Sequence, residues 1–320
     1  MRSPTLLYLG GLGRSGSTII ERLLGQLPGV CSVGEVVHLW RRGIGDAERC
    51  GCGEPFPDCP FWSKVGLAAF GGWDNVNLDE VNKLRAAVDR TRFIPTLARS
   101  TLSAEHRRQV ADYLSYYLRV YDGIAEVTGC QAIVDSSKHA SLAFCLRWSE
   151  GTDLRVVHIV RDPRAVAYSW TREVSRPDVN GPAAPRDSRM WTYSSPTAAL
   201  QWNAQNGAMQ LLARLGTPVL RIRYEDFVRA PSAALGEIAS FARLPDAATT
   251  GFLGEDDAGY WADLAPSHTV SGNPVRFATG RVRLRLDERW RASMPAAQRR
   301  VVSALTYPLL RHYGYPRGQA

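Results

Sequence analysis

Short apolar runs separated by glycine-rich or polar turns recur along the chain and predict an α/β fold. Residues 154–160 are almost continuously apolar, which is typical of a strand buried on both faces of a parallel sheet. Further strands are expected at 5–10, 30–34, 131–135 and 217–223. Because apolar residues at helical spacing follow most of these runs, we expect a central parallel sheet flanked by helices.

The stretch between residues 41 and 128 interrupts this alternation. Residues 41–75 are rich in Gly, Pro and Cys, and helices are expected over about 78–92 and from a Ser103 cap to about 128. The chain shows no internal repeat and no clear domain boundary. We therefore expect one P-loop-like domain over 1–320, with a helical and irregular insert at 41–128.

Basic residues exceed acidic ones, 39 against 31 in 320 residues, and only three of the basic residues are Lys. The Arg residues are spread along the chain, whereas a nucleic-acid-binding protein would more often cluster basic runs among aromatic residues. This pattern argues against a nucleic-acid partner. It leaves two interpretations open: a general bias toward Arg, or a site for a small polyanion that Arg can grip bidentately.

The chain lacks a run of about 18 apolar residues, so no transmembrane segment is expected. Its first residues imitate a signal peptide, with one Arg and a short apolar run. A glycine-rich loop follows instead of a cleavage site with small residues. We interpret this stretch as the first strand of a cytoplasmic protein.

The first loop matches the Gly-x-Gly-x-x-Gly fingerprint of dinucleotide-binding proteins at Gly11, Gly13 and Gly16. It lies between a predicted strand and a predicted helix, and Glu35 follows about 20 residues later, where a ribose-binding acid would fall. An NAD(P)-dependent Rossmann oxidoreductase is therefore one possible function.

The same loop also nearly fits a phosphate-binding P-loop, except that Ser17 stands where that motif has Lys. A third interpretation rests on the number of hydrogen-bond donors in the loop. Backbone N–H groups, hydroxyls and one guanidinium would meet at the start of a helix and could hold a terminal anionic group. The donor side chains are Arg14, Ser15, Ser17 and Thr18.

A second anion site is expected at the end of the 154–160 strand. Arg161 stands at its carboxyl end, where open α/β sheets bind ligands, and Ser169 lies in the helix that follows. Alone, Arg161 could simply pair with Asp162. Together with the first loop, it indicates a ligand that carries two separated anionic groups.

These two motifs resemble those of sulfotransferases that use 3′-phosphoadenosine 5′-phosphosulfate (PAPS). The sequence GRSGST at 13–18 resembles their loop for the 5′-phosphosulfate, and VRDPRAVAYS at 160–169 resembles their 3′-phosphate motif. Segments 224–227, 268–277 and 287–290 resemble bacterial members of the superfamily. The resemblance implies cofactor contacts from Gly13, Arg14, Ser15, Gly16, Ser17, Thr18, Arg161, Ser169, Ser271 and Arg276.

The resemblance also implies a reaction and its catalytic residues. A loop Arg paired with a Glu is similar to the tyrosylprotein branch, which implies Glu35 as the general base, with His38 as a weaker candidate. Arg14 and Lys138 would stabilise the charge that develops on the leaving phosphate. The sulfuryl group would pass in line to a hydroxyl of a small molecule, lipid or carbohydrate, leaving adenosine 3′,5′-bisphosphate. No metal would be required.

The insert carries a compact group of thiols at Cys50, Cys52 and Cys59. A zinc site needs four ligands, and no fourth ligand is evident from the spacing, so we expect reduced thiols without metal. The insert would lie on the acceptor side. Aromatic residues such as Trp62 and Trp191 could line an acceptor cleft or belong to the core, and the long loop 172–195 could form a lid.

Overall fold

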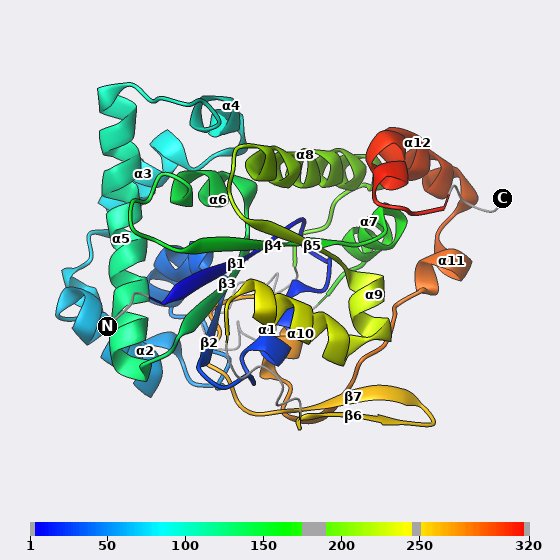
Figure 1. The fold of residues 1–320 in the computed structure, drawn as a ribbon, viewed down its shortest axis with the longest axis horizontal. Coiled ribbons are helices and arrows are strands. Elements are labelled where there is room, and N and C mark those ends of the chain that lie inside the picture. Colours follow the sequence, from blue (N-terminus) through cyan, green and yellow to red (C-terminus); the bar gives the residue numbers. More distant parts are fainter. Residues whose placement is uncertain (1–3, 175–189, 245–250, 317–320) are drawn as a thin grey trace.

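A five-stranded parallel sheet forms the centre of the computed structural model, which describes residues 4–174, 190–244 and 251–316 (Figure 1). Its strands are β1 (Thr5–Gly10), β2 (Val30–Gly34), β3 (Ala132–Lys138), β4 (Leu154–Val160) and β5 (Val219–Arg223). All five predicted strands are present. The α/β class with a central parallel sheet is therefore confirmed.

The strand order is β2-β3-β1-β4-β5, so β3 lies between the first two strands of the chain. A Rossmann sheet has the order 3-2-1-4-5-6, in which the first two strands are neighbours. The observed order therefore argues against the dinucleotide-binding alternative. It also places the carboxyl ends of β2, β3, β1 and β4 along one edge, where open α/β sheets bind their ligands.

Helices cover both faces of the sheet, as Figure 1 shows. One face carries α6 (Ala140–Leu146) and α8 (Ser195–Arg214), and α7 (Pro163–Thr171) and α12 (Ala296–His312) pack against α8. The other face carries α1 (Ser17–Leu24), α9 (Tyr224–Arg229) and α10 (Pro231–Phe241). Alternation along β1 builds both cores, because Leu6 and Tyr8 join one hydrophobic cluster while Leu7 and Leu9 join the other.

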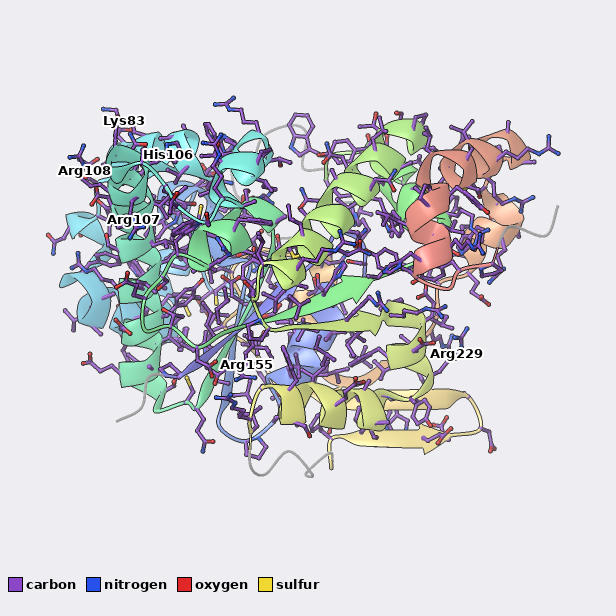
Figure 2. The ribbon with its side chains drawn as sticks, turned by 45° about the horizontal axis from the view of Figure 1, so that its top comes forward. Lys83, His106, Arg107, Arg108, Arg155 and Arg229 are labelled. Carbon is purple, nitrogen blue, oxygen red and sulfur yellow. The ribbon has the colours of Figure 1, made fainter. Side chains whose placement is uncertain are left out.

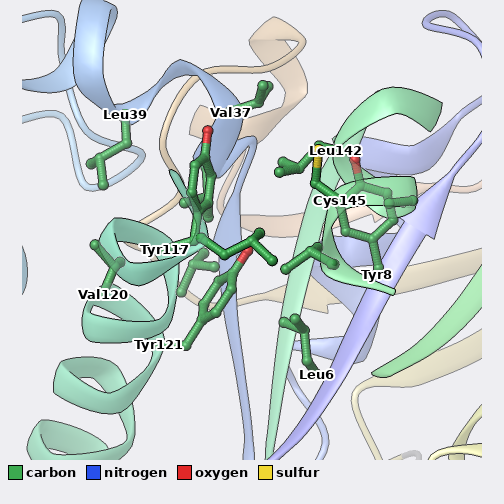
Figure 3. Close-up of a cluster of buried hydrophobic side chains, with 14 of the residues drawn as sticks. Leu6, Tyr8, Val37, Leu39, Tyr117, Val120, Tyr121, Leu142 and Cys145 are labelled. Atoms are coloured by element: carbon green, nitrogen blue, oxygen red, sulfur yellow. The ribbon is translucent and has the colours of Figure 1, made fainter. Parts of the chain in front are cut away.

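The insert packs on the face of the sheet that carries α6. It contains α2 (Pro60–Phe70), α3 (Leu78–Val88), α4 (Ile94–Leu97) and α5 (Ala104–Thr128). The predicted cap of α5 is confirmed, since Ser103 Oγ accepts a hydrogen bond from the His106 backbone N–H at 3.2 Å. Figure 3 shows Tyr117 and Tyr121 of α5 in one cluster with Leu6 and Tyr8 of β1, so the insert and the sheet share one core.

A small antiparallel sheet follows the central one: β6 (Leu253–Asp256), β7 (Gly259–Leu264) and β8 (Gly280–Arg283). The sequence predicts an irregular stretch over 265–285, and this is wrong at β8. The strands are too short to show a period-two pattern, and tertiary packing fixes them instead. A Cβ at Gly254 would lie 2.1 Å from the Trp261 ring, so this close packing requires glycine.

Basic side chains lie on separate elements, as Figure 2 shows. Lys83 is on α3, Arg107 and Arg108 are on α5, Arg155 is on β4 and Arg229 is at the end of α9. Among the described helices, none is long and apolar enough to cross a membrane.

Candidate active site

A cavity of about 650 Å³ opens at the carboxyl edge of the central sheet. The residues that follow β1, β2 and β4 and the last residue of β3 line it together. These are Gly11, Glu35, Arg161 and Lys138. Ligand sites in proteins commonly enclose about 300–1,000 Å³, so this cavity is large enough for a nucleotide-sized molecule.

The loop between β1 and α1 presents a helix N-terminus to the cavity. Gly16 takes a left-handed conformation (φ 86°) at the N-cap, and no side chain within the described residues caps the helix. A Cβ at Gly16 would lie 2.2 Å from the Tyr224 ring, so the loop can approach this ring only with glycine. The first N–H groups of a helix have no partner within the helix, so a helix terminus of this kind can bind an anion.

Arg14 places a cation beside this helix terminus. Its guanidinium lies 5.2 Å from the centre of the Trp170 ring, and Trp170 Nε1 donates to the Gly13 carbonyl at 3.0 Å. Arg14 Nε and Nη2 are buried and have no hydrogen-bond partner within the described part of the chain. Burial lowers the pKa of Arg14, and the nearby Glu35 opposes this shift. Buried guanidinium donors without partners are the feature expected where an anionic ligand binds.

Glu35, Lys138 and His38 form a largely buried polar group that lines the same cavity. Lys138 donates a hydrogen bond to Glu35 Oε1 within an ion pair. His38 Nε2 lies 3.4 Å from Glu35 Oε2. Burial, reinforced by the positive charge of Arg42, holds the pKa of His38 well below its ordinary value, so its imidazole is neutral at pH 7.

Arg161 connects the second predicted anion site to the first loop. Its Nη1 donates to the Arg14 carbonyl at 2.9 Å, and its Nη2 donates to the Asp287 carbonyl at 3.2 Å. The guanidinium lies 4.9 Å from the centre of the Tyr224 ring. Ser169, on α7, also lines the cavity. The ends of β1 and β4 therefore contribute cations to one site.

Most of the residues predicted from the sequence line this cavity: Gly13, Arg14, Gly16, Ser17, Thr18, Glu35, Lys138, Arg161 and Ser169. Three do not lie in its lining. Ser15 Oγ donates to the Leu12 carbonyl. Ser271 Oγ accepts from Arg42 Nη1 at 2.6 Å. Arg276 is buried and donates to backbone carbonyls. Ser271 and Arg276 therefore hold the backbone on either side of Gly272 and Asn273, which do line the cavity.

One buried residue behind the site, Glu21, carried no clear sequence signal. Glu21 is fully buried on α1, where it accepts hydrogen bonds from the Gly34 N–H at 2.7 Å and from Ser136 Oγ at 2.8 Å. It thereby ties the ends of β2 and β3 together. Burial raises its pKa to about 7. A Glu on an amphipathic helix is usually assigned to the solvent face, so only tertiary structure shows this role.

The candidate acceptor aromatics separate into two groups. Trp62 is fully buried in the core, whereas Trp191 is 82% exposed and lines the cavity together with Tyr193. Within the predicted lid 172–195, the segment 175–189 lies outside the described residues.

Fold and site together define an α/β protein with a donor-rich loop and a second cationic strand end around one cavity. The family model described as "Sulfotransferase family" matches residues 71–248. The chain therefore belongs to the sulfotransferase family.

Individual relatives extend this comparison. Carbohydrate sulfotransferase 3 of Homo sapiens and of Mus musculus are each 28% identical over 174 residues. Each match covers 51% of this chain but only 34% of the relative. The sulfotransferase domain from the olefin synthase of Synechococcus PCC 7002 has a TM-score of 0.50 at 20% identity, covering 99% of this chain and 96% of that one. This likeness supports the sulfotransferase fold.

Proposed function

We propose that the protein transfers a sulfuryl group from PAPS to a hydroxyl of a small-molecule, lipid or carbohydrate acceptor. The observation that carries this proposal is the Arg14 guanidinium, whose Nε and Nη2 are buried and have no partner among the residues that the structure describes. It lies beside the N-terminus of α1, which no described side chain caps. Family membership indicates which anion this site would bind, because a sulfotransferase must hold a donor of the sulfuryl group.

The residues present fit PAPS at two points. The loop 13–18 and the first turn of α1 would hold its 5′-phosphosulfate with Arg14, Ser17, Thr18 and backbone N–H groups. Arg161 and Ser169 would hold the 3′-phosphate, because both line the same cavity from β4 and α7. Ser15 would contribute through its backbone, since its hydroxyl is bonded to the Leu12 carbonyl.

When bound, PAPS supplies the sulfuryl group: the acceptor oxygen bonds to sulfur, the bond from sulfur to the phosphate oxygen breaks, and adenosine 3′,5′-bisphosphate leaves. Glu35 takes the proton of the acceptor hydroxyl. Arg14 and Lys138, which both line the cavity, would stabilise negative charge on the phosphate oxygens. Charge that develops in a partly buried site is stabilised more strongly by fixed cations than it would be in water.

Lys138 also holds Glu35 before the reaction. Its ion pair fixes the Glu35 carboxylate, and the Glu35 N–H donates to the Val270 carbonyl at 2.7 Å, so both the side chain and the backbone of the base are oriented. The neutral His38 adds no positive charge that would compete with Lys138 for this carboxylate.

The insert would provide the acceptor side, because Arg42 and Thr91 bring it to the cavity. Trp191 and Tyr193 would add aromatic surface on the same site.

A binding assay tests the donor part of the proposal first. Adenosine 3′,5′-bisphosphate at about 100 times its dissociation constant should stabilise the protein by about 2.7 kcal/mol in a thermal-shift assay. A shift with NAD and none with the bisphosphate would overturn the proposal.

Transfer is then tested with 35S-labelled PAPS and a metabolite extract. We expect label to move from PAPS into an organic sulfate ester only when the protein is present. Binding of the bisphosphate without any transfer, across extracts containing phenols, lipids and glycosides, would contradict the enzymatic part of the proposal.

A further inference from the structure

A second cluster of reactive side chains lies outside the cavity lining. It contains Cys50, Cys52, Cys59 and His268, whose ligand atoms all lie within 4.8 Å of one another. From the sequence we expect no metal here, because no fourth ligand is evident from the spacing. The structure supplies a candidate, His268, which is 209 residues from Cys59 and lies between β7 and the short helix Pro274–Phe277.

The four ligand atoms are spaced like the corners of a small tetrahedron. Bonds of about 2.3 Å from zinc to sulfur and about 2.0–2.1 Å to nitrogen give edges of about 3.8 Å between sulfurs and about 3.6 Å between sulfur and nitrogen. Cys59 Sγ lies 3.5 Å from Cys50 Sγ and 3.8 Å from Cys52 Sγ. His268 Nδ1 lies 3.3 Å from Cys59 Sγ and 3.9 Å from Cys50 Sγ. We propose that Cys50, Cys52, Cys59 and His268 bind one structural Zn²⁺ ion.

Other uses of these thiols fit the geometry less well. A disulfide needs its sulfurs about 2.05 Å apart, and the Cys50 and Cys59 sulfurs are 3.5 Å apart. An iron–sulfur cluster would spread ligand atoms bound to different irons farther apart than the 4.8 Å limit found here. Soft thiolates together with one imidazole in a tetrahedral set select zinc, and four protein ligands leave no open position for catalysis.

The chain prepares the ligands before any metal arrives. Cys50 and Cys52 lie in a tight turn that two backbone hydrogen bonds hold. The Cys50 N–H donates to the Glu54 carbonyl at 2.8 Å, and the Gly53 N–H donates to the Cys50 carbonyl at 2.9 Å. Phe61 stacks on the His268 ring, with centres 5.0 Å apart and planes 14° apart, and so fixes the direction of Nδ1.

The metal would connect the insert to the wall of the active-site cavity. Beside His268, the Thr269 carbonyl accepts from the Gly51 N–H at 3.0 Å. The next residue, Val270, pairs with the end of β2 and accepts the Glu35 N–H at 2.7 Å. Gly272 then lines the cavity, where a Cβ would lie 3.4 Å from Glu35 Oε1. Zinc would therefore fix the segment that orients Glu35, closing a long loop with one ion.

Metal content is the first test. Wild-type protein purified in metal-free buffer should carry about one equivalent of zinc per chain by elemental mass spectrometry. The Cys59→Ser and His268→Ala variants should each retain less than about 0.2 equivalents, whereas the matched control Cys130→Ser, a partly buried thiol outside the cluster, should retain about one. Metal-free wild-type protein, or a Cys59→Ser variant with full zinc, would overturn the proposal.

Two measurements on wild-type protein avoid any question of variant folding. Co²⁺ exchanged into the site should give the visible bands of tetrahedral cobalt and near-ultraviolet thiolate charge-transfer bands. Alkylation mapping should find Cys50, Cys52 and Cys59 reactive only after chelation, and hydrogen exchange at Gly51 and Val270 should then increase. A Cys50–Cys59 disulfide, thiols that are equally reactive before chelation, or unchanged exchange at both amides would contradict a zinc ion in this position.

Discussion

Replacing Glu35 by Gln removes the proposed general base while keeping its shape. The amide keeps one oxygen that can accept from Lys138, and the backbone bond of residue 35 to the Val270 carbonyl is untouched. The side chain loses its capacity to take a proton. General-base catalysis is worth about 10²–10⁴ in rate, so we expect turnover to fall by that factor, or about 3–5 kcal/mol of transition-state stabilisation.

Donor binding should respond differently from turnover. Glu35 lies close enough to raise the pKa of Arg14 electrostatically, so it also competes with any anion for that guanidinium. The Glu35→Gln substitution removes this competing charge. We therefore expect the dissociation constant of adenosine 3′,5′-bisphosphate to stay the same or to decrease, and calorimetric titration measures it directly.

The rate is followed as release of adenosine 3′,5′-bisphosphate, with saturating PAPS and the acceptor fraction identified by 35S transfer. Glu126→Gln is the matched control, because Glu126 is exposed on α5 and does not line the cavity. His38→Gln is the rival variant, since the neutral His38 imidazole lies 3.4 Å from Glu35 and can also accept a proton.

For His38→Gln we expect a loss of less than about 10-fold, because His38 would only support the orientation of Glu35. Glu35→Gln turnover within about threefold of wild type, combined with a loss of about 100-fold or more in His38→Gln, would refute the reasoning. The base would then be His38.

Three further predictions concern binding, backbone geometry and pH. Arg161→Met should weaken binding of adenosine 3′,5′-bisphosphate by about 10-fold or more beyond any loss for adenosine 5′-phosphate, which lacks the 3′-phosphate; equal losses in calorimetry would contradict the assignment. Gly16→Ala should lower the free energy of unfolding by at least about 1–2 kcal/mol in urea titration, because φ is 86° and the Cβ would meet Tyr224. The control Gly236→Ala, which meets nothing within 4 Å, should not destabilise the protein. Burial raises the pKa of Glu21 from 4.5 to about 7, so the folded state holds this proton more tightly than the unfolded state, and its contribution to stability is lost as pH rises from 4.5 to 7. Between pH 4.5 and 7 the free energy of unfolding should therefore fall less in the Glu21→Gln variant than in wild type. The difference between the two falls should be up to about 3 kcal/mol, and identical plots of unfolding free energy against pH would contradict this.

The sequence predicts the five strands of the central sheet and both anion motifs, because each of them depends on residues that are consecutive in the chain. The bounds of β2 and β4 match the prediction, since both are mainly apolar segments with turn residues before them and a charged residue after them. The position of β3 between β1 and β2 cannot be predicted from local sequence patterns. Strand order depends on which long-range pairing buries the most apolar surface. His268 shows the same limit: the spacing of the thiols is visible in the sequence, whereas their fourth neighbour comes from a distant segment.

Arg14 and Lys138, which both line the cavity, have strained backbone conformations. Both are non-glycine residues with positive φ, 73° and 68°. The left-handed region costs an L-residue about 1–2 kcal/mol, and glycine would relieve that cost at either position. The chain instead keeps a long cationic side chain at both positions, and both line the same cavity. Strain of this kind persists where the surrounding structure fixes it, here through the Arg161 bond to the Arg14 carbonyl and the Lys138 bond to Glu35. The two strained residues are therefore best explained as positions where the location of a cation matters more than local stability.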